Sequence, residues 1–401
     1  MNVHIPLFEP AGPARIGLMT ATKDAVARHR TAWTASVALA FVLVSACGAG
    51  SGGTSTGPTA ITPAAERLYA VVESSSAAAQ PDTVAIVGMD GVARAKATFA
   101  PRIGPAIPDA YVPLQGVAQV AGSGVYYIDG TGTVRVLRVG SQPQIVARFP
   151  LQPAQEDVWF AVSPDGSSVL AGIVTFPALG PIITGTSWNQ LIGPTKFDLE
   201  SASAGGQTKT LVHLESPQGG NWPAAIFPVA WTSAGSVAML PTNLSSQNVW
   251  PGGPLYVIDG TGKTTSQLGG ADCWSASITS SGFIACQTAT SGTVTVRDAT
   301  GASVWLTHVD GFDARSLYVS ADGQAISHHS QVETHTGGMV AMPAGFRAEG
   351  WLDNKTVVGR ATTDASTIGG PNEGDLLRIS LDNPTLVQDL GFKGDFVAAL
   401  A

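Results

Sequence analysis

The fold of this 401-residue chain is clearest in the stretch Phe160-Ala161-Val162-Ser163-Pro164-Asp165-Gly166-Ser167-Ser168-Val169-Leu170. An apolar strand leads into a tight turn that contains glycine, and a second apolar strand follows. Glycine in such a turn supplies a positive φ angle without steric cost. The stretch therefore predicts a β-hairpin.

The same strand–turn–strand unit recurs along the chain. Its further copies are residues 120–125, 231–236, 278–283, 319–324 and, without the glycine, 351–356. A second unit, a strand that runs into Asp-Gly or Asp-Ala, is found at residues 84–91, 255–262 and 294–301. The similar segment Asp129-Gly130-Thr131-Gly132 is expected one strand earlier in its own repeat, so we treat it as local turn chemistry.

These two units predict an all-β chain built from repeats. Two turns within each repeat of about 40–50 residues indicate four strands per repeat, and such sheets must stack on neighbours to bury their faces. Around a ring this arrangement is a β-propeller. Seven blades fit best, with six or eight as alternatives because residues 324–350 are short and weakly patterned. The first repeat lacks its innermost strand, and residues 395–400 are predicted to supply it and close the ring.

The repeats resemble the blades of WD40-like and TolB-like β-propellers, above all at residues 160–170. The resemblance covers about residues 67–400. It implies a propeller architecture, which proteins of many different activities share.

The N-terminal region predicts export. Residues 32–44 form an apolar run, Arg28 and Arg30 precede it, and Leu43-Val44-Ser45-Ala46-Cys47 ends it. The run has the length of the apolar centre of a signal peptide, about 7–15 residues, rather than the roughly 20 of a spanning helix. Its end resembles the lipobox of bacterial lipoproteins, which implies a diacylglyceryl group on the thiol of Cys47. The alternative is a buried core helix.

We therefore expect a cleaved lipoprotein signal peptide at residues 1–46, a lipidated flexible tether at 47–65 and a β-propeller at 66–401. Met19 is an alternative start. As a random coil the Gly/Ser/Thr-rich tether spans about 25 Å, and two acyl chains on one cysteine suffice for stable anchoring. The sequence thus predicts a lipid-anchored protein on the extracytoplasmic side of the cell membrane, with a loop-bearing propeller face close to the membrane.

Charge argues against two classes of partner. The chain carries a formal net charge of −8, and its few lysines and arginines are scattered. Nucleic-acid-binding proteins instead concentrate basic residues on one face. The same balance argues against electrostatic attachment to anionic lipid. The acyl chains on Cys47 must then provide the membrane attachment.

Two cysteines remain when Cys47 carries lipid. Cys273 and Cys286 flank a strand–turn–strand segment, so they are expected to face each other near the open end of a hairpin. Disulfides persist outside the cytoplasm. We predict a Cys273–Cys286 bridge, with two reduced core cysteines as the alternative.

Three residues in one short stretch have side chains that could bind a transition metal: His328, Glu333 and His335. Histidine and carboxylate ligands at short spacing suit zinc and related ions. His329 would point to the opposite face of a strand from His328. Three ligands make only an open site, so we expect exposed polar residues and no bound metal.

The segment Thr300-Gly301-Ala302-Ser303-Val304-Trp305 resembles part of the tryptophan-docking motif of quinoprotein propellers. Asp298 lies one position too close to Thr300, and Val296 replaces the alanine of that motif. The other repeats lack the tryptophan. We therefore expect a hairpin turn here and no bound cofactor.

A long apolar insertion at residues 176–194 is the candidate for partner binding. It contains Leu179, Ile182, Ile183 and Trp188. Loops longer than about 12–15 residues in compact domains are often functional. The alternative is a lid that folds back over its own blade. Two more Trp-Pro pairs, at residues 222–223 and 250–251, favour an aromatic surface.

Taken together, these features favour a non-catalytic role: binding a protein or cell-envelope polymer, or scaffolding a complex. No catalytic residue is assigned. A propeller enzyme, lactonase-like or quinoprotein-like, with its site in the central channel is the alternative. It would need several polar side chains on the innermost strands, which are rich in Ala, Val, Ser and Trp. A further alternative is an envelope-assembly lipoprotein similar to the propeller component of outer-membrane protein insertion.

Overall fold

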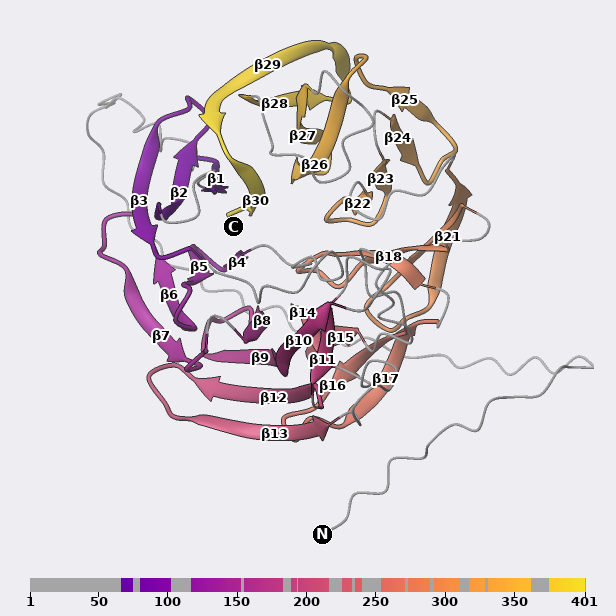
Figure 1. Cartoon of the computed structure of the whole chain (residues 1–401). Coiled ribbons are helices and arrows are strands. Elements are labelled where there is room, and N and C mark those ends of the chain that lie inside the picture. The colour runs from indigo at the N-terminus through magenta and orange to yellow at the C-terminus, as the bar shows by residue number, and fades with distance from the viewer. Residues whose placement is uncertain are drawn as a thin grey trace, which may run out of the picture. The chain divides into compact units, whose positions relative to one another are not determined.

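The computed structural model describes residues 66–74, 80–101, 117–152, 155–182, 189–192, 194–215, 226–232, 235–239, 254–270, 273–288, 292–309, 317–328, 331–361 and 375–400. The chain divides into two compact units, Met1–Ile61 and Thr62–Ala401, and all described residues belong to the second. Every regular element among them is a β-strand (Figure 1). No helix in this part of the chain is long and apolar enough to cross a membrane.

The strands form seven four-stranded antiparallel sheets within the described residues, here called blades 1–7 and given from the innermost strand outward. Blade 1 contains β30 (Asp395–Ala399), β1 (Leu68–Glu73), β2 (Asp82–Gly88) and β3 (Ala93–Phe99). Blade 2 contains β4 (Ala118–Ala121), β5 (Gly124–Ile128), β6 (Thr133–Leu137) and β7 (Gln144–Arg148). Blade 3 contains β8 (Glu156–Val162), β9 (Ser168–Thr175), β12 (Lys196–Ser203) and β13 (Thr208–Glu215).

The remaining four blades follow the same order. Blade 4 contains β14 (Phe227–Thr232), β15 (Gly235–Met239), β16 (Leu255–Ile258) and β17 (Thr264–Gly269). Blade 5 contains β18 (Cys273–Ile278), β19 (Ile284–Thr288), β20 (Thr293–Arg297) and β21 (Ser303–His308). Blade 6 contains β22 (Leu317–Val319), β23 (Ala325–His328), β24 (Gln331–Thr334) and β25 (Met339–Ala341). Blade 7 contains β26 (Phe346–Asp353), β27 (Thr356–Ala361), β28 (Asp375–Ser380) and β29 (Asn383–Lys393).

The hydrophobic core lies between blades. Seven clusters of buried residues occur in the described chain, and each joins two neighbouring blades. Because strand side chains alternate between faces, Val158 and Phe160 of β8 pack toward blade 2 while Trp159 packs toward blade 4. Each sheet is thus buried on both faces. The predicted seven-bladed β-propeller is confirmed, and the short strands of blade 6 explain why its sequence pattern is weak.

The ring is closed by strands from the two ends of the folded domain. β30 pairs antiparallel with β1, with Tyr69 opposite Ala399 and Val72 opposite Asp395. In Figure 1 the yellow β30 lies beside the indigo β1. This pairing removes two open sheet edges, and it confirms that residues 395–400 supply the missing strand.

The propeller has two unlike faces. Hairpins between the first and second and between the third and fourth strands of each blade lie at one face, which we call the short-turn face. Connections from second to third strand and from blade to blade lie at the opposite face, the long-connection face. The longest of these connections are residues 100–117, 176–195, 216–226, 240–254 and 362–374. The Asp129 turn joins β5 to β6, so it lies one strand earlier than its relatives, as predicted.

Candidate functional site

The Asp-x-Thr-Gly turns are closed by their own aspartate. Asp259 Oδ1 accepts hydrogen bonds from Thr261 N (2.8 Å), Thr261 Oγ1 (2.6 Å) and Lys263 N (3.1 Å). The turns at Asp129 and Asp298 repeat this pattern atom for atom. Hydrogen bonds to the charged form lower the pKa of Asp259 and Asp298. These carboxylates therefore stabilise the turns that contain them.

The Ser-x-Asp-Gly turns close in a related way. Ser163 Oγ donates to Asp165 Oδ1 (2.6 Å), which also accepts from Ser167 N (3.0 Å). Ser320 and Asp322 repeat the first contact at 2.7 Å in blade 6. The Ser163 hydroxyl and its neighbouring donors lower the pKa of Asp165 to about 2. These contacts are also structural, and both turns lie at the short-turn face.

Polar side chains of the innermost strands bridge neighbouring blades. Gln119 of β4 donates through Nε2 to Phe160 O of β8 (2.7 Å) and accepts from Val162 N (3.3 Å). Ser277 of β18 accepts from Val319 N of β22 (3.1 Å). The Trp351 indole of β26 donates to Tyr318 O of β22 (3.1 Å). These side chains satisfy the backbone of adjacent inner strands and thereby fix the spacing of the blades.

A buried polar cluster that sequence analysis missed lies where blade 7 meets blade 1. Arg360 of β27 is 2% exposed and donates to the Glu349 carboxylate, to Gly394 O and to Asp395 Oδ1, the last at 3.0 Å. Glu349 also accepts from Phe396 N (3.1 Å). Burial raises the pKa of Glu349, and the Arg360 guanidinium opposes that shift. The cluster links β26 and β27 to the strand that closes the ring.

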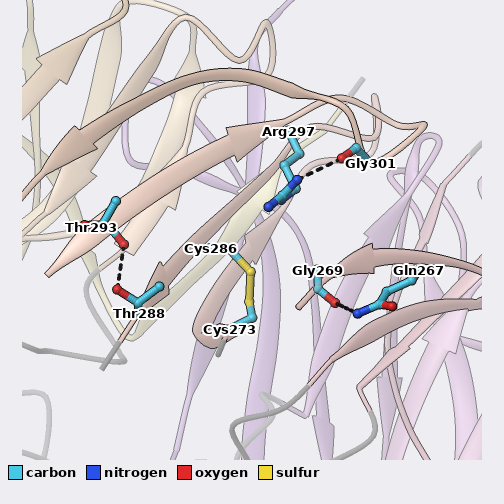
Figure 2. Close-up of a disulfide and its surroundings, with 8 residues drawn as sticks. All are labelled: Gln267, Gly269, Cys273, Cys286, Thr288, Thr293, Arg297 and Gly301. Carbon is cyan, nitrogen blue, oxygen red and sulfur yellow. Dashed lines mark hydrogen bonds between the residues drawn. A yellow bond between two sulfur atoms is a disulfide. The ribbon is translucent and has the colours of Figure 1, made fainter. Parts of the chain in front are cut away.

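The two cysteines of the predicted pair belong to β18 and β19 of blade 5 and lie at disulfide distance, with their side chains toward blade 4. The Cα atoms of Cys273 and Cys286 are 5.3 Å apart, and both side chains belong to the core between these blades. Gly269 of β17 packs against them, as Figure 2 shows. A register shift after Cys273 makes the pair diagonal, since Cys286 lies opposite Ala276. The geometry supports the predicted bridge.

The histidine stretch is arranged differently from expectation. His328 is 3% exposed within β23, which corrects the expected exposed position. Glu333 accepts a hydrogen bond from Thr307 Oγ1 of blade 5, and His335 contacts Gln324 Oε1 at 3.2 Å. Among the described residues, no group of three His, Cys, Asp or Glu could hold a metal ion. His329 lies outside these residues.

Trp305 does more than follow a hairpin turn. The expected turn forms at residues 298–302, and the Trp305 indole then donates to Gly323 O of blade 6 (2.7 Å). Its ring stacks on His335 with centroids 5.7 Å apart. The tryptophan therefore docks onto the next blade. The sequence analysis expected only the hairpin turn, and the contact of Trp305 with blade 6 was not part of that expectation.

The apolar insertion is a separate hairpin at the long-connection face. β10 (Ala178–Ile182) pairs with β11 (Asn189–Ile192), with Leu179 opposite Leu191, between β9 and β12 of blade 3. Ile183 and Trp188 lie outside the described residues, as do Cys47 and the predicted signal peptide and tether. The insertion thus interrupts blade 3 as predicted.

Comparison with protein-family models and with curated proteins finds no match. Among solved structures, BamB from Moraxella catarrhalis is 13% identical with a TM-score of 0.37, covering 70% of this chain and 71% of that one. TolB from Acinetobacter baumannii is 15% identical with a TM-score of 0.36 (83% and 66%). An oligogalacturonate lyase in complex with manganese is 8% identical with a TM-score of 0.39 (77% and 70%). Likenesses this low do not bear on function, and the fold rests on the seven sheets themselves.

Proposed function

We propose that this protein is an extracytoplasmic, lipid-anchored propeller that binds a protein or envelope-polymer partner through its long-connection face, without catalysis. A diacylglyceryl group on Cys47 would attach it to the cell membrane, and residues 47–65 would form the tether. Loops on a rigid scaffold carry binding residues in many folds. The propeller supplies such a scaffold.

One observation carries this proposal: three of the five long connections begin and end at one face of two adjacent blades, blades 3 and 4. Residues 176–195 leave and re-enter blade 3, residues 216–226 join blade 3 to blade 4, and residues 240–254 leave and re-enter blade 4. The described strand ends fix where all three begin and end. Each contains a tryptophan in the sequence. Tryptophan is enriched at protein interfaces because it combines a large apolar area with a hydrogen-bond donor.

The inner strands support binding over catalysis. An enzyme site in the channel needs polar side chains free to touch a substrate. Gln119, Ser277, Trp351 and Glu349 instead hydrogen-bond the backbone of neighbouring inner strands. A channel enzyme remains the alternative, and no contact among the described residues favours it.

Photo-crosslinking from the two faces tests the binding site. A photoreactive amino acid would replace the exposed Gln155 or Glu215, which border the connections of blade 3 at the long-connection face. The exposed Ala204, in the β12–β13 turn of the same blade at the short-turn face, is the matched control. In intact cells we expect the same adduct from Gln155 and Glu215 and none from Ala204. An adduct from Ala204 alone would contradict the proposal.

Anchoring needs its own test. Cys47→Ala should release the protein from the membrane fraction, since the acyl chains are its proposed attachment. Unchanged fractionation of Cys47→Ala would rule out the lipid anchor without bearing on the partner-binding face.

A further inference from the structure

The folded chain begins at the short-turn face. β1 starts at Leu68, which lies opposite Gly88, the last residue of β2 before the β2–β3 hairpin. Leu400 N, just after β30, donates to Leu68 O (2.9 Å). Leu68 is therefore fixed in a sheet on both sides, at the end of the blade where the short turns lie.

Two ion pairs hold the preceding residues on the same face. Glu66 accepts from Arg94 Nε (3.2 Å), next to the β2–β3 hairpin. Arg67 pairs with Asp353, next to the β26–β27 hairpin of blade 7. Exposed ion pairs contribute little stability individually. These two nevertheless place Glu66 and Arg67 beside the short turns of blades 1 and 7. The entry point itself rests on the pairing of β1.

The orientation of the domain decides how much of the predicted tether's average span is used. This root-mean-square span is about 25 Å for a flexible coil of its length. The six residues of β1 give the blade a height of about 20 Å. Bringing the long-connection face onto the membrane would use most of the average span to run along the side of the domain. Turning the short-turn face toward the membrane requires no such extension.

The charge of the short turns does not outweigh the preference for turning the short-turn face toward the membrane. The short turns carry Asp90, Asp165, Asp259 and Asp298, and an anionic lipid surface repels them. The Debye length is about 8 Å at physiological ionic strength. A face turned toward the membrane at about 25 Å, the average span of the tether, lies about three Debye lengths away, so this repulsion is largely screened.

We infer that the short-turn face is turned toward the anchoring membrane, and that the long-connection face points away from it and receives a protein approaching from the aqueous side. The inference rests on the lipid anchor and binding face of the proposed function. It reverses the sequence-based expectation of a loop-bearing face close to the membrane. The point at which β1 enters the sheet is the reason, and the sequence pattern did not reveal it.

Energy transfer to labelled lipid measures this orientation. The lipidated full chain is reconstituted in vesicles that carry acceptor-labelled headgroups, with a donor on Ala321→Cys or Ala344→Cys. Both alanines are exposed and border blade 6, one at each face. Cys273 and Cys286 are paired, and Cys47 would carry lipid, so only the new cysteine takes the label.

Transfer should be more efficient from Ala321→Cys, roughly twofold, because a blade height of about 20 Å separates the two positions. Equal transfer, or more transfer from Ala344→Cys, overturns the inferred orientation while leaving the anchor and binding face intact. Absence of transfer from both positions, with protein that does not float with the vesicles, overturns the anchor as well.

Discussion

The short-turn face and the long-connection face close the ends of their strands in different ways. At the short-turn face, side chains such as Asp259 and Asp165 accept several hydrogen bonds from the turn that contains them. At the long-connection face, the Asp129 turn closes in the same way, but other strand ends are held by side chains from different strands. Arg360 contacts Asp395 of β30, and Cys273 lies at bonding distance from Cys286.

This difference separates connections whose length is fixed by the turn from connections whose length can vary. A turn that satisfies its own backbone leaves little room for insertion. A strand end held by a cross-link leaves the connection beyond it free to change length. In blade 3, Glu156 accepts from Gln152 N (2.7 Å) and Thr175 Oγ1 (3.0 Å), and the apolar hairpin is inserted immediately after Thr175.

The largest expected effect comes from breaking the cluster at the ring closure. Arg360→Ala leaves the mostly buried Glu349 carboxylate without its cation, and loss of one partner of a buried pair costs about 3–5 kcal/mol. Denaturant unfolding should show this loss. The double variant Arg360→Met/Glu349→Leu should recover part of it, because no buried charge is then left unpaired. A double variant less stable than Arg360→Ala would contradict this explanation.

The cysteine pair should come next. A bridge that closes a loop of this length is worth about 3 kcal/mol in the chain-entropy model. Unfolding of the exported protein with and without reductant should differ by that amount. Non-reducing mass mapping should recover a joined Cys273–Cys286 peptide, and two free thiols would rule the bridge out.

Two glycines with similar positive φ angles distinguish crowding from backbone strain. An added Cβ at Gly132, at the long-connection face, would lie 1.7 Å from Phe149 O, whereas Gly140, at the short-turn face, has no atom within 4 Å. Alanine at either position adopts nearly the same unfavourable φ angle in the folded protein and restricts the unfolded chain equally. Gly132→Ala should therefore be the less stable by about 1–3 kcal/mol, the usual cost of overpacking. Equal thermal midpoints would contradict the crowding.

The smallest effect should come from the pH dependence of one turn. The pKa of Asp165 is lowered to about 2, below the value of about 3.9 expected in the unfolded chain. Its stabilising contribution is therefore full above pH 4 and is lost as pH falls toward 2. Between these pH values, Asp165→Asn should show a weaker dependence of unfolding midpoint on pH than the unaltered protein. Parallel curves would contradict the assignment.

Sequence analysis predicted the features whose causes are local. The hairpins, the number of blades and the offset of the Asp129 turn follow from turn residues and strand alternation within a few positions. Closure by residues 395–400 followed from a strand missing at one end and spare at the other. The cysteine pair followed from one hairpin.

Other features depend on contacts between distant segments. Gln119 meets Phe160, and Arg360 meets Asp395, only because the ring brings those strands together. His328 was expected at the surface because its stretch is polar, yet β23 places it in the interior. The orientation that we infer for the domain depends on which end of β1 lies beside the short turns, which no local pattern encodes.

Removal of the apolar hairpin tests most directly whether the long-connection face binds the partner. Thr175 and Lys196 are already paired, so Asn-Gly in place of residues 177–194 can join β9 to β12 in a two-residue turn. We predict a folded protein with a thermal midpoint close to that of the full chain and no partner adduct from Gln155 or Glu215. A folded variant that keeps the full adduct would contradict this prediction.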